Sequence, residues 1–140
     1  MWRVQYGTMY IAAPFISGLK ASAYITGQYS LHRTVTGPAK TQIPIISFRT
    51  QQWPVAEAIA AALVYEEFFT CTTELALCGT SDPRVRHAVI VIIKATIIRH
   101  IQRCLPGLAE RLGAQGTLEQ NYIPRLEVNI SVNPIMYSRI

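Results

Sequence analysis

A short glycine cluster is the feature of this 140-residue chain that most invites a chemical interpretation. Gly113, Ala114 and Gly116 stand together in "GAQG", directly after a long apolar run. Glycine costs a helix or a strand up to about 1 kcal/mol, so the cluster indicates a tight turn or a close backbone approach. Three interpretations are open, namely a helix C-cap, a phosphate cradle and a turn that faces a cofactor.

Known phosphate-binding motifs do not fit this turn. It lacks the Lys-Ser or Lys-Thr pair of a P-loop, and it follows a helical pattern rather than a strand. Neither a P-loop nor a dinucleotide-binding fold is therefore supported, and composition alone favours the C-cap.

Other reactive residues do not form a recognisable catalytic or metal motif. No GxSxG segment is present. The histidines are not at ligand spacing from one another, so we expect no metal site. The cysteines are odd in number and lack CxxC spacing, which argues against a disulfide scaffold and a zinc site and favours a reduced compartment. These residues are His32, His87 and His100, and Cys71, Cys78 and Cys104.

The charge balance permits an anionic partner but does not identify one. Thirteen Lys and Arg against eight acids give a net charge of +5, and the basic residues are spread along the chain. We expect no nucleic-acid binding, because the basic residues between 84 and 103 would decorate several faces of one helix without interleaved aromatics. We also expect no membrane span, because the apolar run "AVIVIIKATII" is short and contains Lys94.

Apolar periodicity predicts an all-α fold, an antiparallel bundle of three long helices. The first is expected from Val4 to about Leu31, the second from about Ser47 to Cys78, and the third, placed centrally, from Pro83 to about Leu112. "TGPAKTQIP" is predicted to be a loop, and no strand pair is convincing. We predict a helical domain over residues 1–126 and a divergent irregular tail over 127–140.

Three segments together resemble a known family. They are "QYGTMYIAAPFISGLKASAYITGQYSLHRTV", "PIISFRTQQWPVAEAIA" and "RHAVIVIIKATIIRHIQRCLPGLAERLGAQG". In this order they are similar to the C-terminal helical domain of acyl-CoA oxidases and dehydrogenases, closest to the oxidases, over roughly residues 5 to 123. "GAQG" resembles that family's GGxG turn, with Ala114 in place of the second glycine.

The resemblance implies an FAD enzyme that oxidises a fatty acyl-CoA to the trans-2-enoyl-CoA in β-oxidation. In the family a glutamate removes the α-proton while a hydride passes to the flavin, which carries the hard chemistry. A homodimer or higher oligomer, or docking to a fuller partner, is expected, because the family's fourth bundle helix has no counterpart here and apolar faces of the other three would be left exposed.

Seven residues match positions near the family's FAD. Arg33 matches an arginine that reaches the FAD pyrophosphate of a neighbouring subunit, and a cation interacting with the negative end of its helix is the alternative. Thr36 falls near a flavin-contacting position where an aromatic is frequent. In the dehydrogenases a glutamine directly after "NF" contacts FAD, whereas here Arg49 follows "SF" and Gln51 and Gln52 come after it as in the oxidases, so which side chain faces the cofactor is open. At the turn, the implied FAD-binding residues are Gly113, Gln115 and Gly116.

The family's catalytic base is missing from this chain. That glutamate lies beyond the turn and precedes a glycine, and no glutamate here is followed by glycine. Glu119 is too close to the turn, and Glu127 opens the divergent tail, so no catalytic residue is assigned. The family's fourth bundle helix is also missing, so an inactive partial domain is expected, and a non-catalytic oligomerisation or interaction module is the alternative.

The last three residues bear on location. Ser138, Arg139 and Ile140 resemble a degenerate peroxisomal address, and a chance tripeptide is the competing explanation. A peroxisomal location suits an oxidase, with the cytoplasm or the mitochondrion as alternatives.

Overall fold

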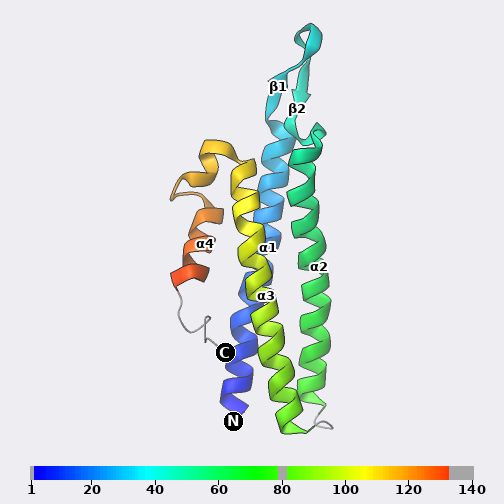
Figure 1. The fold of residues 1–140 in the computed structure, drawn as a ribbon, viewed down its shortest axis with the longest axis vertical. Helices are drawn as coiled ribbons and strands as arrows, with labels where there is room; N and C mark the ends of the chain where they lie inside the picture. The colour runs from blue at the N-terminus through cyan, green and yellow to red at the C-terminus, as the bar shows by residue number, and fades with distance from the viewer. Residues whose placement is uncertain (1, 79–81, 133–140) are drawn as a thin grey trace.

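Three long helices run side by side along the molecule in the computed structural model, which describes residues 2–78 and 82–132. They are α1 (Trp2–His32), α2 (Arg49–Leu77) and α3 (Pro83–Arg111). Successive helices run in opposite directions, and a shorter helix, α4 (Tyr122–Val132), turns back beside α3 (Figure 1). The predicted all-α class is confirmed, and the three long helices lie within a few residues of their predicted bounds.

The start of α3 follows directly from the sequence. The Asp82 carboxylate accepts a hydrogen bond of 2.8 Å from the Arg84 backbone N–H, and Pro83 occupies the first turn. Such a cap satisfies a donor that the helix itself cannot pair, and proline fits there because its missing N–H is not needed.

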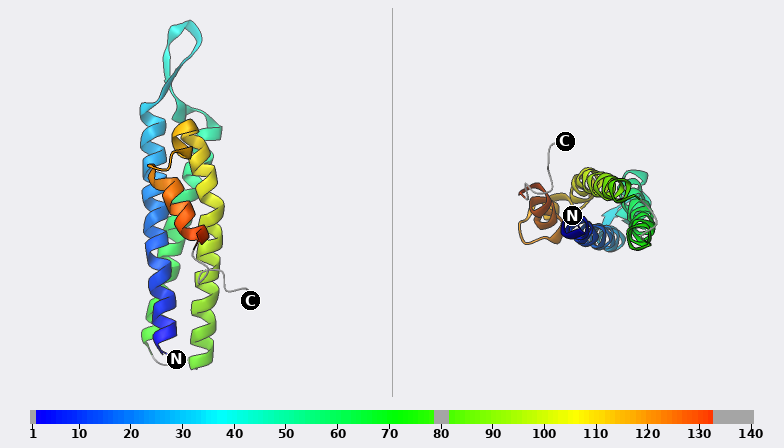
Figure 2. Two further views of the ribbon diagram at one scale, coloured as in Figure 1. Left: turned by 90° about the vertical axis from the view of Figure 1, so that its left-hand side faces the viewer. Right: turned by 90° about the horizontal axis from the view of Figure 1, so that it is seen from below.

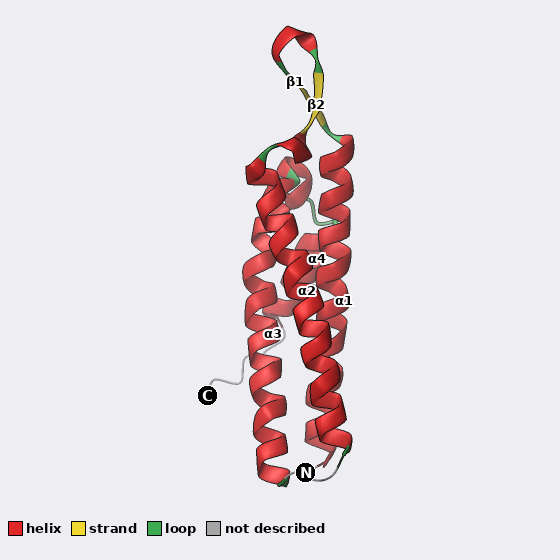
Figure 3. Ribbon diagram, turned by 90° about the vertical axis from the view of Figure 1, so that its right-hand side faces the viewer, coloured by secondary structure: helices red, strands yellow, loops and turns green. Residues whose placement is uncertain are grey.

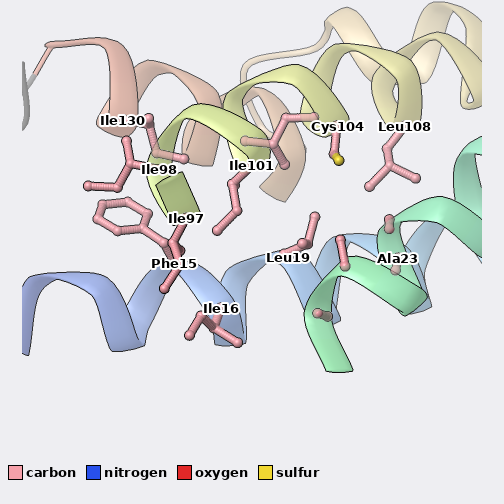
Figure 4. Packing of buried hydrophobic residues seen from close by; sticks show 14 of the residues in the cluster. Phe15, Ile16, Leu19, Ala23, Ile97, Ile98, Ile101, Cys104, Leu108 and Ile130 are labelled. Atoms are coloured by element: carbon pink, nitrogen blue, oxygen red, sulfur yellow. The ribbon is translucent and has the colours of Figure 1, made fainter. Parts of the chain in front are cut away.

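The core lies mainly between α1 and α3. Leu19 of α1 meets a row of apolar residues on α3 that recurs every three or four positions, and all of these side chains are buried (Figure 4). This row comprises Ile97, Ile101, Leu105 and Leu108. Because α3 also packs against α2 and α4, its predicted central position is confirmed.

Helix α2 adds small residues to this core. Ala58, Ala61 and Ala62 are buried against the other helices, with Val55 beside them. Alanine lets helix axes approach closely. The opposite face of α2 carries large apolar side chains that remain exposed, and α2 and α4 lie on opposite sides of the α1–α3 pair (Figure 2).

The prediction of an irregular tail over 127–140 is wrong for residues 127–132, which belong to α4. Ile123 and Ile130 are fully buried, and Leu126 between them is half-buried. This is a helical spacing, and it covers the α1–α3 core. The Asn121 side chain accepts a 3.1 Å bond from the Ile123 N–H at the start of the helix. Residues 133–140, including the tripeptide 138–140, lie outside the described residues.

The expectation of a loop without strands between the first two helices is also wrong. Strands β1 (Thr34–Thr36) and β2 (Gln42–Pro44) pair antiparallel, with Val35 opposite Ile43. They form a hairpin that projects beyond the ends of the helices (Figure 3). Short 3₁₀ turns follow β1 and β2, η1 (Pro38–Lys40) and η2 (Ile45–Ser47).

The residues of the hairpin turn explain why the hairpin was not predicted from the sequence. Ala39 and Lys40 both have positive φ angles, 59° and 61°. Hairpin turns with two such residues usually carry Asn or Gly there, and that signal is missing.

Among the described residues, no helix has an apolar stretch long enough to cross a lipid bilayer.

Candidate functional site

The structure brings the predicted FAD-binding residues to one end of the bundle. Arg33 and Thr36 follow α1, Gln51 and Gln52 open α2, and the glycine turn follows α3. These element ends coincide because α1 and α3 both run toward the hairpin and α2 runs away from it (Figure 1). We call residues 32–52 and 111–117 the hairpin end.

Gln51 connects the three long helices at this end. Its Nε2 donates to Ser30 Oγ on α1 and to the Arg111 carbonyl at the end of α3, both at 2.8 Å. Ser30 Oγ in turn donates to the Thr26 carbonyl at 2.7 Å. Both amide hydrogens of the buried Gln51 are thereby bonded within the chain. The adjacent Gln52 is exposed, so its amide is accessible to a ligand.

Two different constraints account for the glycines of "GAQG". Gly113 has φ +60°, the left-handed conformation in which helices often end. Gly116 is buried inside the 3₁₀ turn η3 (Gly113–Thr117), where a Cβ atom would collide with the Ala109 carbonyl oxygen. The C-cap interpretation therefore explains Gly113, and a close approach within the chain explains Gly116.

The remaining predicted contacts are accessible. The side chains of Arg33, Thr36, Gln52 and Gln115 are exposed, and within the described residues the Arg33 guanidinium has no ion pair. The Arg33 backbone is fixed, because its carbonyl accepts a 2.9 Å bond from the Ile45 N–H.

The charge at the hairpin end is positive. No acidic residue precedes Glu57 in the chain, whereas Arg33, Lys40 and Arg49 are all exposed there. Residues 32–52 thus carry three exposed cations and no acid and attract an anion, whereas Arg111 at the end of α3 is paired with Glu110 at 3.1 Å.

The two acids that follow the glycine turn lie in different elements. Glu119 is exposed in the connection between η3 and α4, and Glu127 lies half-buried within α4. Neither precedes a glycine, so the expectation that no catalytic residue can be assigned stays a prediction.

A second group of reactive side chains lies between α2 and α3. The Tyr65 hydroxyl and His100 Nδ1 share a 2.8 Å hydrogen bond, and His100 Nε2 is 4.0 Å from a Glu57 carboxylate oxygen. Ligand atoms of Glu57, His100 and Cys104 all lie within 4.8 Å of one another. We call these four residues the Glu57 cluster.

Burial controls the acid–base state of two members of this cluster. Burial, with a smaller contribution from the Glu57 charge, raises the pKa of the Cys104 thiol to about 11. Burial also raises the pKa of Tyr65. Both groups therefore hold their protons at neutral pH, and Cys104 is a poor nucleophile in this state.

The spacing of the three histidines does not indicate the Glu57 cluster, because its other members are a glutamate, a tyrosine and a cysteine. His100 and Cys104 are one helical turn apart on α3, a spacing that places both on one face. Glu57 and Tyr65 are two turns apart on α2. The packing of α2 against α3 brings the two pairs together, and the spacing within either helix does not predict that packing.

Comparison of the chain with models of protein families gave no match, and comparison with curated proteins gave none.

Proposed function

We propose that the chain is part of an FAD-dependent acyl-CoA oxidase, and that its hairpin end holds the pyrophosphate of FAD. The parent reaction is oxidation of a fatty acyl-CoA to the trans-2-enoyl-CoA in fatty acid β-oxidation. The flavin accepts the hydride when bound, and this chain supplies position and charge.

The observation that carries the proposal is the convergence at the hairpin end. An exposed arginine, an exposed glutamine and a glycine turn come from three separate segments, and they are the same residues that the family resemblance singled out. Arg33 can bind phosphate oxygens through two parallel N–H bonds.

The proposal assigns the residues unequal parts. Arg33 binds the pyrophosphate, Gln52 and Gln115 contact the polar edge of the cofactor, and Thr36 lies on β1 beside it. Gln51, Gly113 and Gly116 shape the backbone from inside. Without the family's glutamate, the chain alone lacks the positioned base that accelerates proton transfer by about 10² to 10⁴. A peroxisomal location suits this reaction.

Titration of FAD against the purified chain tests the proposal. Hydrogen bonds to a charged group contribute about 1.5–3 kcal/mol, so Arg33→Gln should weaken FAD binding about 10- to 100-fold. Arg84→Gln is the matched control, because it removes the same charge from the far end of α3, where Arg84 is exposed. Riboflavin, which lacks the pyrophosphate, should not distinguish the variants. Equal losses from both variants, or no binding of FAD, would refute the proposal.

The exposed face of α2 favours a second candidate, a homo-oligomerisation module. Trp53, Ile59, Leu63 and Val64 are large, apolar and exposed on one helix. Two hollows flank them, about 510 Å³ on the α3 side and about 380 Å³ on the α1 side, and both are lined mostly by apolar side chains. Contiguous apolar surface of this kind is typical of an interface, and a second copy of the chain is the occupant we propose.

A further inference from the structure

The Glu57 cluster has the composition and arrangement of a transition-metal site. We propose that Glu57, His100 and Cys104 bind a zinc ion, with Tyr65 orienting the imidazole. This inference is independent of the proposed flavin function, because none of the four cluster residues belongs to the hairpin end.

The donor set selects the metal. A thiolate, an imidazole and a carboxylate are the three ligand types that zinc accepts in proteins, and calcium and magnesium would require oxygen ligands throughout. Ionised Glu57 and Cys104 would supply two negative charges, which balance a divalent ion.

The geometry requires only a small contraction. In a tetrahedral zinc site, metal bonds of about 2.0–2.3 Å place ligand atoms about 3.3–3.6 Å apart. The three ligand atoms here lie within 4.8 Å of one another, and the distance from His100 Nε2 to the Glu57 oxygen is 4.0 Å. The Glu57 side chain is half exposed, so its carboxylate can move inward without disturbing the core.

Tyr65 provides the outer contact that ligand histidines usually have. Its hydroxyl is hydrogen-bonded to His100 Nδ1, and the two rings meet edge to face with centroids 5.4 Å apart. When Nδ1–H donates to the hydroxyl, the lone pair of Nε2 points away from Tyr65, and Nε2 is the nitrogen near Glu57.

The surroundings leave room for a fourth ligand. Glu57, Tyr65 and His100 line the 510 Å³ hollow beside α2, so water can reach the ion. Arg99 and Arg103 lie next to His100 on a neighbouring hollow and oppose a cation. Both are exposed, so solvent and salt screen their charges, whereas the three ligands would contact the ion directly.

Binding exchanges a proton for the metal. The Cys104 S–H bond breaks, the sulfur electron pair forms the bond to zinc, and the proton passes to solvent. No oxidant or reductant is needed.

Cobalt(II) titration of the metal-free full chain tests the site. One equivalent should bind, giving a thiolate-to-cobalt charge-transfer band and the intense visible bands of tetrahedral cobalt, and added zinc should remove both. Cys104→Ser should lose the charge-transfer band. A double variant, Cys71→Ser with Cys78→Ser, is the control, because both thiols are exposed, on α2 and at its C-cap, outside the cluster.

Two further variants separate binding from folding. Glu57→Gln and Tyr65→Phe alter exposed or half-buried groups, so circular dichroism should stay unchanged while cobalt affinity falls about 10- to 100-fold. A charge-transfer band that survives in Cys104→Ser, that disappears in the double control variant, or that is absent from the unaltered chain would overturn the proposal.

Discussion

Gln51 shows how a residue singled out for function can serve the fold. Its side-chain amide is buried and donates to the Ser30 hydroxyl on α1 and to the backbone carbonyl of Arg111, the last residue of α3. An amide in this position holds three helix ends in register, whereas Gln52, one residue later, faces solvent.

Substitution of the two glutamines separates the structural role of Gln51 from the binding role proposed for Gln52. Gln51→Ala leaves a buried hydroxyl and a carbonyl without their donor, so we expect a loss of about 1–3 kcal/mol in the free energy of unfolding. Gln52→Ala should change stability little and should weaken FAD binding. Urea unfolding measures the first effect and FAD titration the second. Equal stability of the two variants would contradict the structural part assigned to Gln51.

At the scale of elements, the glycine turn that ends α3 depends on two separate constraints. Gly113 meets open space but has φ +60°, whereas Gly116 has an ordinary φ but lies against the Ala109 carbonyl. The conformation of the turn therefore depends on the backbone angle at Gly113 and on the packing at Gly116.

Alanine substitutions should rank these constraints. In Gly113→Ala the left-handed conformation costs roughly 1–2 kcal/mol. In Gly116→Ala the new methyl group meets backbone that cannot turn aside, so the loss should reach or exceed the roughly 1–3 kcal/mol typical of overpacking. Thermal unfolding measures both, and a Gly116→Ala chain as stable as the unaltered one would show that the turn is not packed as described.

The same scale shows what could be predicted from the sequence. Long apolar periodicity and the Asp82–Pro83 cap identified α1, α2 and α3, because these signals are local. α4 was missed because most of its apolar residues are β-branched, and its burial against α1 and α3 overrides their weak helix preference. The hairpin was missed because Ala39 and Lys40 adopt positive φ without the usual residues.

The two candidate sites also differ in how far the sequence predicts them. The residues of the hairpin end follow helix boundaries, so a correct order of helices suffices to bring them together. The Glu57 cluster depends on the register between α2 and α3, which periodicity does not determine.

For the whole molecule, the uncovered face of α2 predicts self-association. Leu63→Glu should shift the chain toward the monomer, since a charge there disfavours apolar contact. Val128→Glu is the control, because it is equally exposed (57% against 56%) but lies on α4, on the opposite side of the bundle. Light scattering measures the mass. An unaltered chain that is already a monodisperse monomer would contradict this prediction.

The central claim for the molecule is that one end of the bundle binds the FAD pyrophosphate. Amide hydrogen exchange with and without saturating FAD locates binding directly. We predict slower exchange at residues 33–36 and 113–117, with the middle of α2 and the start of α3 unchanged. Protection confined to the middle of α2, or no protection at the hairpin end while FAD is bound, would contradict it.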